Sequence, residues 1–234
     1  MKKLLSIFFL LTFAVMAFGQ TKNTAPIKFK TEPKTFTEAE EAFREFDPDK
    51  LSINANNLTE KDIEDLRVNF FEEVKPYLID KGEYTERLAR LAKPIFLFHQ
   101  SGKSRTAVFK HHRPTVFTWK ETFISFSTGA MDLLTDHEIA ALIAHEIGHL
   151  YFAEALAKAR AEKNDRRARV IELKCDLVAL TTLSKLNIQP SDLISAVKKL
   201  IKERSRLQIG SFETGSPSLQ SREEIYALYI SGKK

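Results

Sequence analysis

The sequence predicts an α+β fold in which a small, mostly antiparallel sheet packs against several helices. Apolar residues recur with the 3.6-residue period of a helix early in the chain and again throughout its second half. Between these stretches, short β-branched and aromatic runs are separated by polar turns, as in antiparallel strands. Because 43% of the 234 residues are hydrophobic and 29% are charged, the chain has enough apolar material for one core.

The N-terminus has the composition of an export signal. Lys2 and Lys3 precede an almost continuous apolar run over residues 4–18, which ends in the small-residue pattern Ala17-Phe18-Gly19 that a signal peptidase recognises. We therefore expect cleavage before Gln20 and a periplasmic or secreted mature protein. The alternative is an uncleaved membrane anchor, although the run is shorter than the roughly 20 residues of a spanning helix.

Composition also excludes several classes of protein. Loss of the two N-terminal lysines would lower the net charge from +5 to about +3, and the charges are mixed along the helices. The basic cluster Lys110-His111-His112-Arg113 fits an exposed turn between strands better than a nucleic-acid-binding surface, which needs a basic face with interleaved aromatic residues. The single cysteine, Cys175, excludes an intrachain disulfide and a four-cysteine zinc site.

The first part of the mature chain is predicted to be a linker followed by helices. Residues 21–35 are polar and contain two prolines, whereas residues 37–46 have the pattern of a short helix. A longer helix begins at Thr59, which can cap it, and residues 84–92 continue in the same style. The apolar residues of the longer helix recur at helical spacing: Ile63, Leu66, Phe70, Val74 and Leu78.

The period then changes to that of strands. Four runs of β-branched and aromatic residues lie at 95–98, 106–109, 115–119 and 122–126. Polar or glycine-containing turns separate them. We expect three or four strands in this region, mostly antiparallel.

After residues 127–129 the chain is predicted to be helical to its end, with a clear helix start at Thr135. Thr135 and Glu138 have the spacing of a capping box, in which each side chain hydrogen-bonds to the backbone amide of the other residue. Asn164 or Asp165 begins the next helix, and Asn187 can end it in a left-handed conformation. Two further helices are expected, one capped by Ser191 and ending at Leu207, the other over residues 222–230.

The helix that begins at Thr135 contains the pattern His-Glu-x-x-His at His145, Glu146 and His149. Positions i and i+4 lie on one helix face, so both imidazoles can reach one metal ion while Glu146 projects beside them. Two ordinary helix histidines are the alternative, but the pair with a glutamate between them favours zinc. Gly148 costs about 1 kcal/mol relative to alanine in a helix, which fits a close approach by another backbone or a substrate.

A catalytic zinc site needs three protein ligands and an open position for water. Glu172 and Asp176 lie four residues apart on the following helix, where Glu172 can bind the metal and Asp176 can hydrogen-bond to a ligand histidine. The alternative is an exposed acidic face. Both residues instead lie among apolar side chains, where an unpaired charge is costly: Val170, Ile171, Leu173, Leu177 and Val178.

Residues 115–222, about half of the chain, resemble the gluzincin metallopeptidases of the HtpX-like, BepA-like and CAAX-prenyl-endopeptidase group. The similar stretches are 123–134 before the motif helix, 135–150 in it and 172–176 after it. The resemblance implies a zincin-type active-site helix and one Zn²⁺ per chain. It assigns His145, His149 and Glu172 as zinc ligands, Glu146 as the catalytic base and Asp176 as the residue that orients His145. The predicted organisation is a signal peptide at 1–19, a linker with a short helix at 20–58 and a metallopeptidase domain at 59–234.

The chain departs from the family pattern at two positions. Cys175 stands where the family often has alanine, and we expect it to be a core residue, with a fourth-ligand or redox role as the alternative. Ser216 stands before Pro217 where the family commonly has histidine, while Arg222 matches a downstream arginine. The oxyanion-stabilising side chain is therefore left open. The alternative role for Arg222 is to tie the last helix to the active-site region.

The predicted function is hydrolysis of peptide bonds in exported or envelope proteins, with a zinc-activated water and Glu146 as general base. The resemblance places an edge strand beside the cleft, and an extended peptide or unfolded protein is expected to pair with it. A nucleic-acid partner is not expected, and membrane association is expected only if the signal is uncleaved. The alternative function is a zinc-containing, chaperone-like module that binds unfolded envelope proteins and rarely cleaves them. The residues assigned to the edge strand are Thr115, Val116, Phe117 and Thr118.

Overall fold

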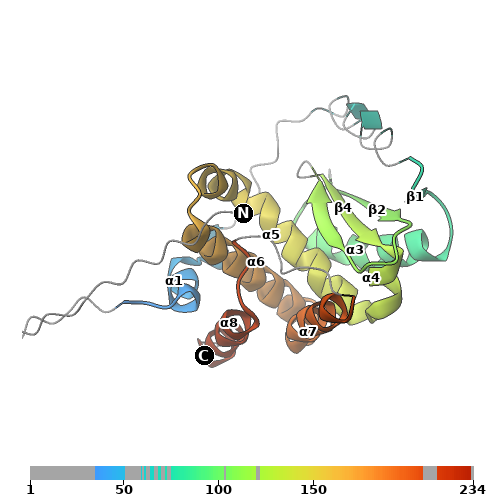
Figure 1. Cartoon of the computed structure of the whole chain (residues 1–234). Coiled ribbons are helices and arrows are strands. Elements are labelled where there is room, and N and C mark those ends of the chain that lie inside the picture. Colours follow the sequence, from blue (N-terminus) through green and yellow to red (C-terminus); the bar gives the residue numbers. More distant parts are fainter. Residues whose placement is uncertain are drawn as a thin grey trace, which may run out of the picture. The chain divides into compact units, whose positions relative to one another are not determined.

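Most of the chain from residue 35 onward is described in the computed structural model. The described residues are 35–50, 59, 61, 64, 65, 68, 69, 72, 75–102, 104–119, 122–207 and 215–232. All of them except Thr35 belong to one compact unit, Phe36–Lys234, shown in Figure 1. The expected signal peptide, its cleavage site and the linker up to residue 34 lie outside the described residues.

Helices form most of this unit. The short helix expected in the linker region is present as α1, and it packs against α6 and α8. Besides the helical residues 61, 64, 65, 68, 69 and 72, the described helices are α1 (Glu38–Glu45), α3 (Glu83–Phe98), α4 (Thr128–Leu133), α5 (Asp136–Ala161), α6 (Asp165–Lys185), α7 (Ser191–Arg206) and α8 (Leu219–Gly232), and a 3-10 turn lies at Pro48–Lys50.

The sheet has four described strands in the order β1-β2-β4-β3. β1 pairs antiparallel with β2 and β3 antiparallel with β4, whereas β2 and β4 run parallel. The expected α+β fold with a small sheet is thus confirmed, with one parallel pair among its three. The strands are β1 (Leu78–Ile79), β2 (Arg105–Phe109), β3 (Val116–Trp119) and β4 (Phe123–Ser127).

One face of the sheet joins the hydrophobic core through alternate residues of each strand. Val108, Ile124 and Phe126 are fully buried in the same cluster as Ile143 and other α5 side chains. In Figure 1 α5 lies between this sheet and α6, and it packs along both. Among the described residues α5 is the one helix long and apolar enough to cross a membrane, yet most of that stretch is buried inside the protein. It is therefore the core helix of the unit.

The prediction of a strand at 95–98 is wrong, because these residues form the last turn of α3. Leu88, Ala92 and Ile95 are fully buried at i, i+4 and i+7, so the helical period continues through the run, whereas Leu97 is 69% exposed. A buried strand would have covered all four residues. The helical pattern dominates here although Pro94 lies inside the helix.

The helix expected from Thr59 ends earlier than its apolar pattern indicated. Residues 61, 64, 65, 68, 69 and 72 are helical, but Leu78 begins β1 and pairs with Phe109. Its inclusion in the helical stripe is therefore wrong, because the helix has already given way to a turn at residues 75–77. The other four apolar positions of that stripe, Ile63, Leu66, Phe70 and Val74, lie outside the described residues.

The predicted helix ends are correct for α5 and α6. The capping box of Thr135 and Glu138 is present at the start of α5, and the Asn164 side chain caps α6. Asn187 has φ 57° and follows α6 in the left-handed conformation. Ser191 as a cap is wrong: Pro190 holds that position with helical backbone angles, so Ser191 is already in the first turn of α7.

Candidate active site

The site is built where α5 and α6 approach each other closely, and Gly148 allows that approach. A Cβ atom at Gly148 would lie 2.6 Å from Cα and 2.7 Å from Cβ of Cys175 on α6. The expectation that Gly148 marks a close backbone approach is confirmed, and the neighbour is α6. Because no side chain separates the helices at this level, groups on both can meet in one place.

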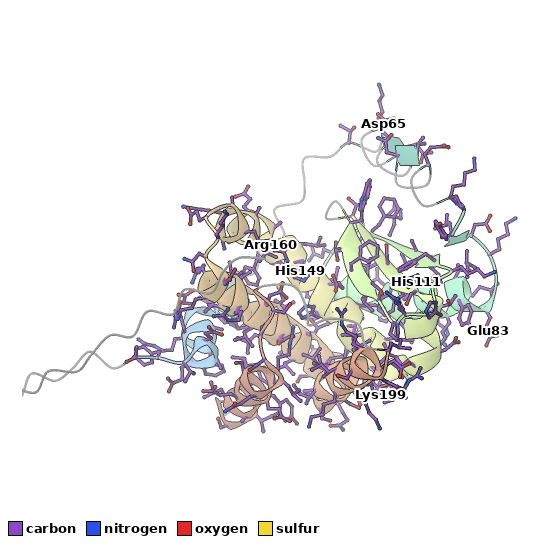
Figure 2. The ribbon with its side chains drawn as sticks, viewed as in Figure 1. Asp65, Glu83, His111, His149, Arg160 and Lys199 are labelled. Carbon is purple, nitrogen blue, oxygen red and sulfur yellow. The ribbon has the colours of Figure 1, made fainter. Side chains whose placement is uncertain are left out.

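His145 and His149 lie one turn apart on α5, with ring centroids 5.1 Å apart and planes at 85°. Together with Glu146 they offer ligand atoms that all lie within 4.8 Å of one another. Figure 2 shows His149 midway along α5 and Arg160 nearer the end of the helix. Helix geometry alone therefore brings together the three residues of the His-Glu-x-x-His motif.

Glu172 on α6 adds a third group. Its Oε2 atom lies 3.5 Å from Nε2 of His145 and 3.7 Å from Nε2 of His149. Ligands about 2.0–2.2 Å from a tetrahedral zinc ion are separated by about 3.3–3.6 Å, so these spacings fit zinc. Two imidazoles and one carboxylate are also a donor set of catalytic zinc sites. The residues present could therefore hold the metal.

Asp176 lies one turn beyond Glu172 and holds the other side of His145. Its Oδ1 atom is 2.8 Å from Nδ1 of His145 and also accepts a hydrogen bond from Arg222 of α8. Because Nδ1–H donates to Asp176, Nε2 is the nitrogen that faces Glu172. Arg222 thus ties α8 to α6 and also lines the cleft described below.

The charges at the site favour a cation. Burial acts to lower the pKa of His145, but its hydrogen bonds to Asp176 and Glu172 outweigh burial and raise that pKa. Burial acts to raise the pKa of Glu172, but the interactions with His145 and His149 lower it. The Glu172 carboxylate therefore stays ionised beside a protonated His145 imidazole. A metal ion bound between the same atoms would take the place of that proton.

Glu146 receives a hydrogen bond from the sheet. The Thr118 hydroxyl, on β3, donates to Oε2 of Glu146 at 2.7 Å. The two residues are 28 positions apart, so helical or strand spacing gave no signal of this contact. Thr118 is thus both a residue of the expected edge strand and a direct neighbour of the motif glutamate.

Cys175 contacts the second histidine. Its Sγ atom lies 3.7 Å from Nδ1 of His149, and its side chain is fully buried. Burial raises the pKa of the thiol, which keeps it neutral. The contact is with Nδ1, whereas Nε2 of His149 is the nitrogen near Glu172.

A cleft of about 700 Å³ contains the assembled groups. One wall is β3 with the residue before it, so all four residues of the expected edge strand line the cleft, and β3 lies at an edge of the described sheet. Ser216 and Arg222 line it as well. Sequence reasoning missed a further part of the lining, an apolar stripe on α7 at i, i+4, i+7 and i+8: Leu193, Val197, Leu200 and Ile201.

A sequence model of Peptidase family M48 matches residues 79–164. The matched segment contains β2, β3, β4 and α5 with His145, Glu146 and His149, and it ends before α6. A search of curated proteins found no match. Peptidases of this family depend on zinc, which agrees with the donor set described above. The chain is therefore a metallopeptidase, a hydrolase of peptide bonds.

Proposed function

We propose that this metallopeptidase is a zinc-dependent endopeptidase that cleaves exported or envelope proteins in an unfolded or extended form. His145, His149 and Glu172 would hold one zinc ion, and Glu146 would be the general base. The observation that carries the proposal is the position of Glu172 Oε2, 3.5 Å and 3.7 Å from the two histidine Nε2 atoms. A third ligand from a separate helix distinguishes a metal site from two ordinary helix histidines.

The chemistry divides between the metal and the chain. Zinc bound there supplies a Lewis acid that polarises the scissile carbonyl and makes water more acidic. Glu146 lies beside both histidines and lines the cleft, so its carboxylate accepts the proton of the attacking water and passes it to the leaving amine. Asp176 holds Nδ1 of His145 and keeps Nε2 for the metal.

The edge strand supports an extended substrate. Within the described sheet β3 pairs with β4 alone, and residues 115–118 line the cleft beside Glu146. A peptide added along β3 would be bound through its backbone, which tolerates many sequences. The apolar stripe on α7 faces the same cleft and suits the apolar side chains that unfolded proteins expose. Three arginines line the cleft, Arg160, Arg204 and Arg222, and in this proposal Arg222 is the one that contacts the developing oxyanion.

The proposal also includes the peptidase subgroup to which the chain belongs and its export from the cytoplasm. Glu172, Asp176 and Arg222 lie outside the matched segment, and their meeting at the site supports the resemblance to the HtpX-like, BepA-like and CAAX-prenyl-endopeptidase group. The signal-like composition of residues 1–19 supports export to the periplasm or beyond.

The test compares the protein that begins at Gln20 with its Glu146→Gln variant on unfolded casein. We expect zinc-dependent cleavage by the first and a loss of about 10²–10⁴-fold in rate for the second, with zinc content retained. Equal rates would contradict the role of Glu146. Binding of casein without any cleavage by the unmodified protein would favour the chaperone-like module instead.

A further inference from the structure

The contact between Thr118 and Glu146 joins the substrate wall of the cleft to the base. A threonine hydroxyl has one proton to donate, and Thr118 donates it to Oε2 of Glu146 at 2.7 Å. Among the described residues, Thr118 is the one donor to this carboxylate. Glu146 is 7% exposed, so little of its surface is open to groups other than its protein neighbours. The orientation of the base therefore depends on one side chain of β3.

The position of that side chain depends in turn on a strand that is held from one side. Thr118 lies opposite Ile124, and Val116 opposite Phe126, both on β4. The other side of β3 has no partner strand within the described sheet. A peptide that pairs along this edge would hold β3 from both sides and restrict the motion of Thr118.

We propose that Thr118 is a positioning residue that orients Glu146, and that pairing of substrate with β3 improves this orientation. The inference rests on the proposed function and extends it to how the site responds to substrate. Thr118 transfers no proton to the reacting atoms; it acts through Glu146. Misplacement of a base affects the chemical step more than substrate binding. We therefore expect loss of the Thr118 hydroxyl to lower kcat more than it changes KM.

Substitutions at Thr118 test the role of the hydroxyl. Thr118→Val keeps the β-branched shape and removes the donor, and Thr118→Ser keeps the donor. Thr106→Val on β2 is the matched control, because Thr106 also lies opposite Ile124 and does not line the cleft. On casein we expect Thr118→Val to lower kcat about tenfold with KM changed less than about twofold, Thr118→Ser to recover most of the loss, and Thr106→Val to match the unmodified protein.

A second measurement needs no activity. In the zinc-free protein, the unfolding midpoint is compared for Thr118→Val, Glu146→Ala and the double variant. The midpoint shift caused by Thr118→Val should disappear in the Glu146→Ala background if the two side chains interact. The same shift in both backgrounds would overturn the proposal.

Peptide length tests the coupling to the edge strand. β3 has four residues, so a peptide of about ten residues covers it on both sides of the scissile bond and one of about four does not. We expect kcat to rise with length in the unmodified protein and to rise less in Thr118→Val.

The outcomes separate this inference from the function on which it rests. If the unmodified protein cleaves casein but Thr118→Val has the same kcat, or Thr118→Ser is as slow as Thr118→Val, the positioning role is overturned and the peptidase assignment stands. If the unmodified protein cleaves neither casein nor peptide with zinc present, both are overturned.

Discussion

Asp176 holds His145 at Nδ1 across 2.8 Å, and the same carboxylate oxygen is held by Arg222. One buried side chain of α6 thus connects the first motif histidine on α5 with the last helix of the chain. Asp176 is 1% exposed, so these two partners, rather than water, hydrogen-bond to its Oδ1 atom. The arrangement orients the imidazole before any metal binds.

The first prediction concerns this contact. Asp176→Asn should weaken zinc binding by about 10–100-fold, because the loss of the negative charge weakens the orientation and donor strength of His145. Competition with a chromogenic chelator measures the affinity. Asp165→Asn is the control, since Asp165 lies exposed in the first turn of the same helix. Equal affinity in the Asp176 variant and the unmodified protein would contradict the role of Asp176.

Gly148→Ala should separate α5 from α6. The added Cβ would meet the backbone of Cys175, so the helices must move apart, at a cost of about 1–3 kcal/mol in the free energy of unfolding. Zinc affinity should fall as well, because Glu172 lies on the displaced helix. Urea unfolding and the chelator titration measure both effects. Gly102→Ala, where a Cβ meets nothing within 4 Å, should change neither.

His99 should make stability depend on pH. Tyr151 lies 2.7 Å from its Nδ1, and Thr182 lies 2.8 Å from its Nε2. Because the Thr182 hydroxyl donates its proton to Val178 O, His99 Nε2–H must be the donor in their contact, and Tyr151 donates to Nδ1. The imidazole is therefore neutral, and burial lowers its pKa from 6.5 to about 4.

Between about pH 4 and pH 6.5, His99 takes up a proton when the protein unfolds. The contribution of His99 to the free energy of unfolding should therefore be fully present above about pH 6.5. It should fall by up to about 3 kcal/mol as the pH drops to about 4. Urea unfolding of the zinc-free protein, compared with that of His99→Gln over this range, isolates the contribution. A parallel loss of stability in both proteins would contradict it.

The ion pair between Glu45 of α1 and the buried Lys174 of α6 should contribute more to stability than an exposed ion pair. Lys174 is 8% exposed and bonds to Glu45, which also accepts from Arg167. Burial acts to raise the pKa of Glu45, but the hydrogen bonds from Lys174 and Arg167 outweigh it and lower that pKa. Glu45→Gln leaves the buried ammonium without its counter-charge and should cost about 1–2 kcal/mol.

The matched control for Glu45→Gln is a glutamate in an exposed pair. Glu72 lies 3.8 Å from Lys75, with both side chains about 70% exposed, so Glu72→Gln should change stability by less than about 0.5 kcal/mol. Chemical denaturation of the two variants at low salt decides the matter. Equal losses would show that burial of Lys174 is not the cause.

Features with short sequence separation were predictable. The capping box at Thr135, the histidine pair on α5 and the left-handed Asn187 each depend on residues within a few positions of one another. The position of Glu172 beside the two histidines was predictable because a carboxylate among apolar residues needs a partner, whereas its role as a zinc ligand stays a prediction. The fold class followed from the change in hydrophobic period.

Other features, which depend on tertiary contacts without a sequence signal, were not predictable. Residues 95–98 have strand-like composition, but the buried positions of α3 continue through Ile95 and fix a helix. The Thr118 hydroxyl reaches Glu146 because β3 packs against α5. The part of the cleft lined by α7 depends on how the helices pack in space, which the sequence pattern did not indicate.

The most direct measurement is the zinc content of the purified protein that begins at Gln20, with two histidine variants of α5. We expect about one zinc per chain in the unmodified protein and in His137→Ala, since the His137 side chain is 65% exposed, and almost none in His149→Ala. A protein purified without zinc that also fails to bind added zinc, or a His149→Ala variant that keeps its full content, would contradict it.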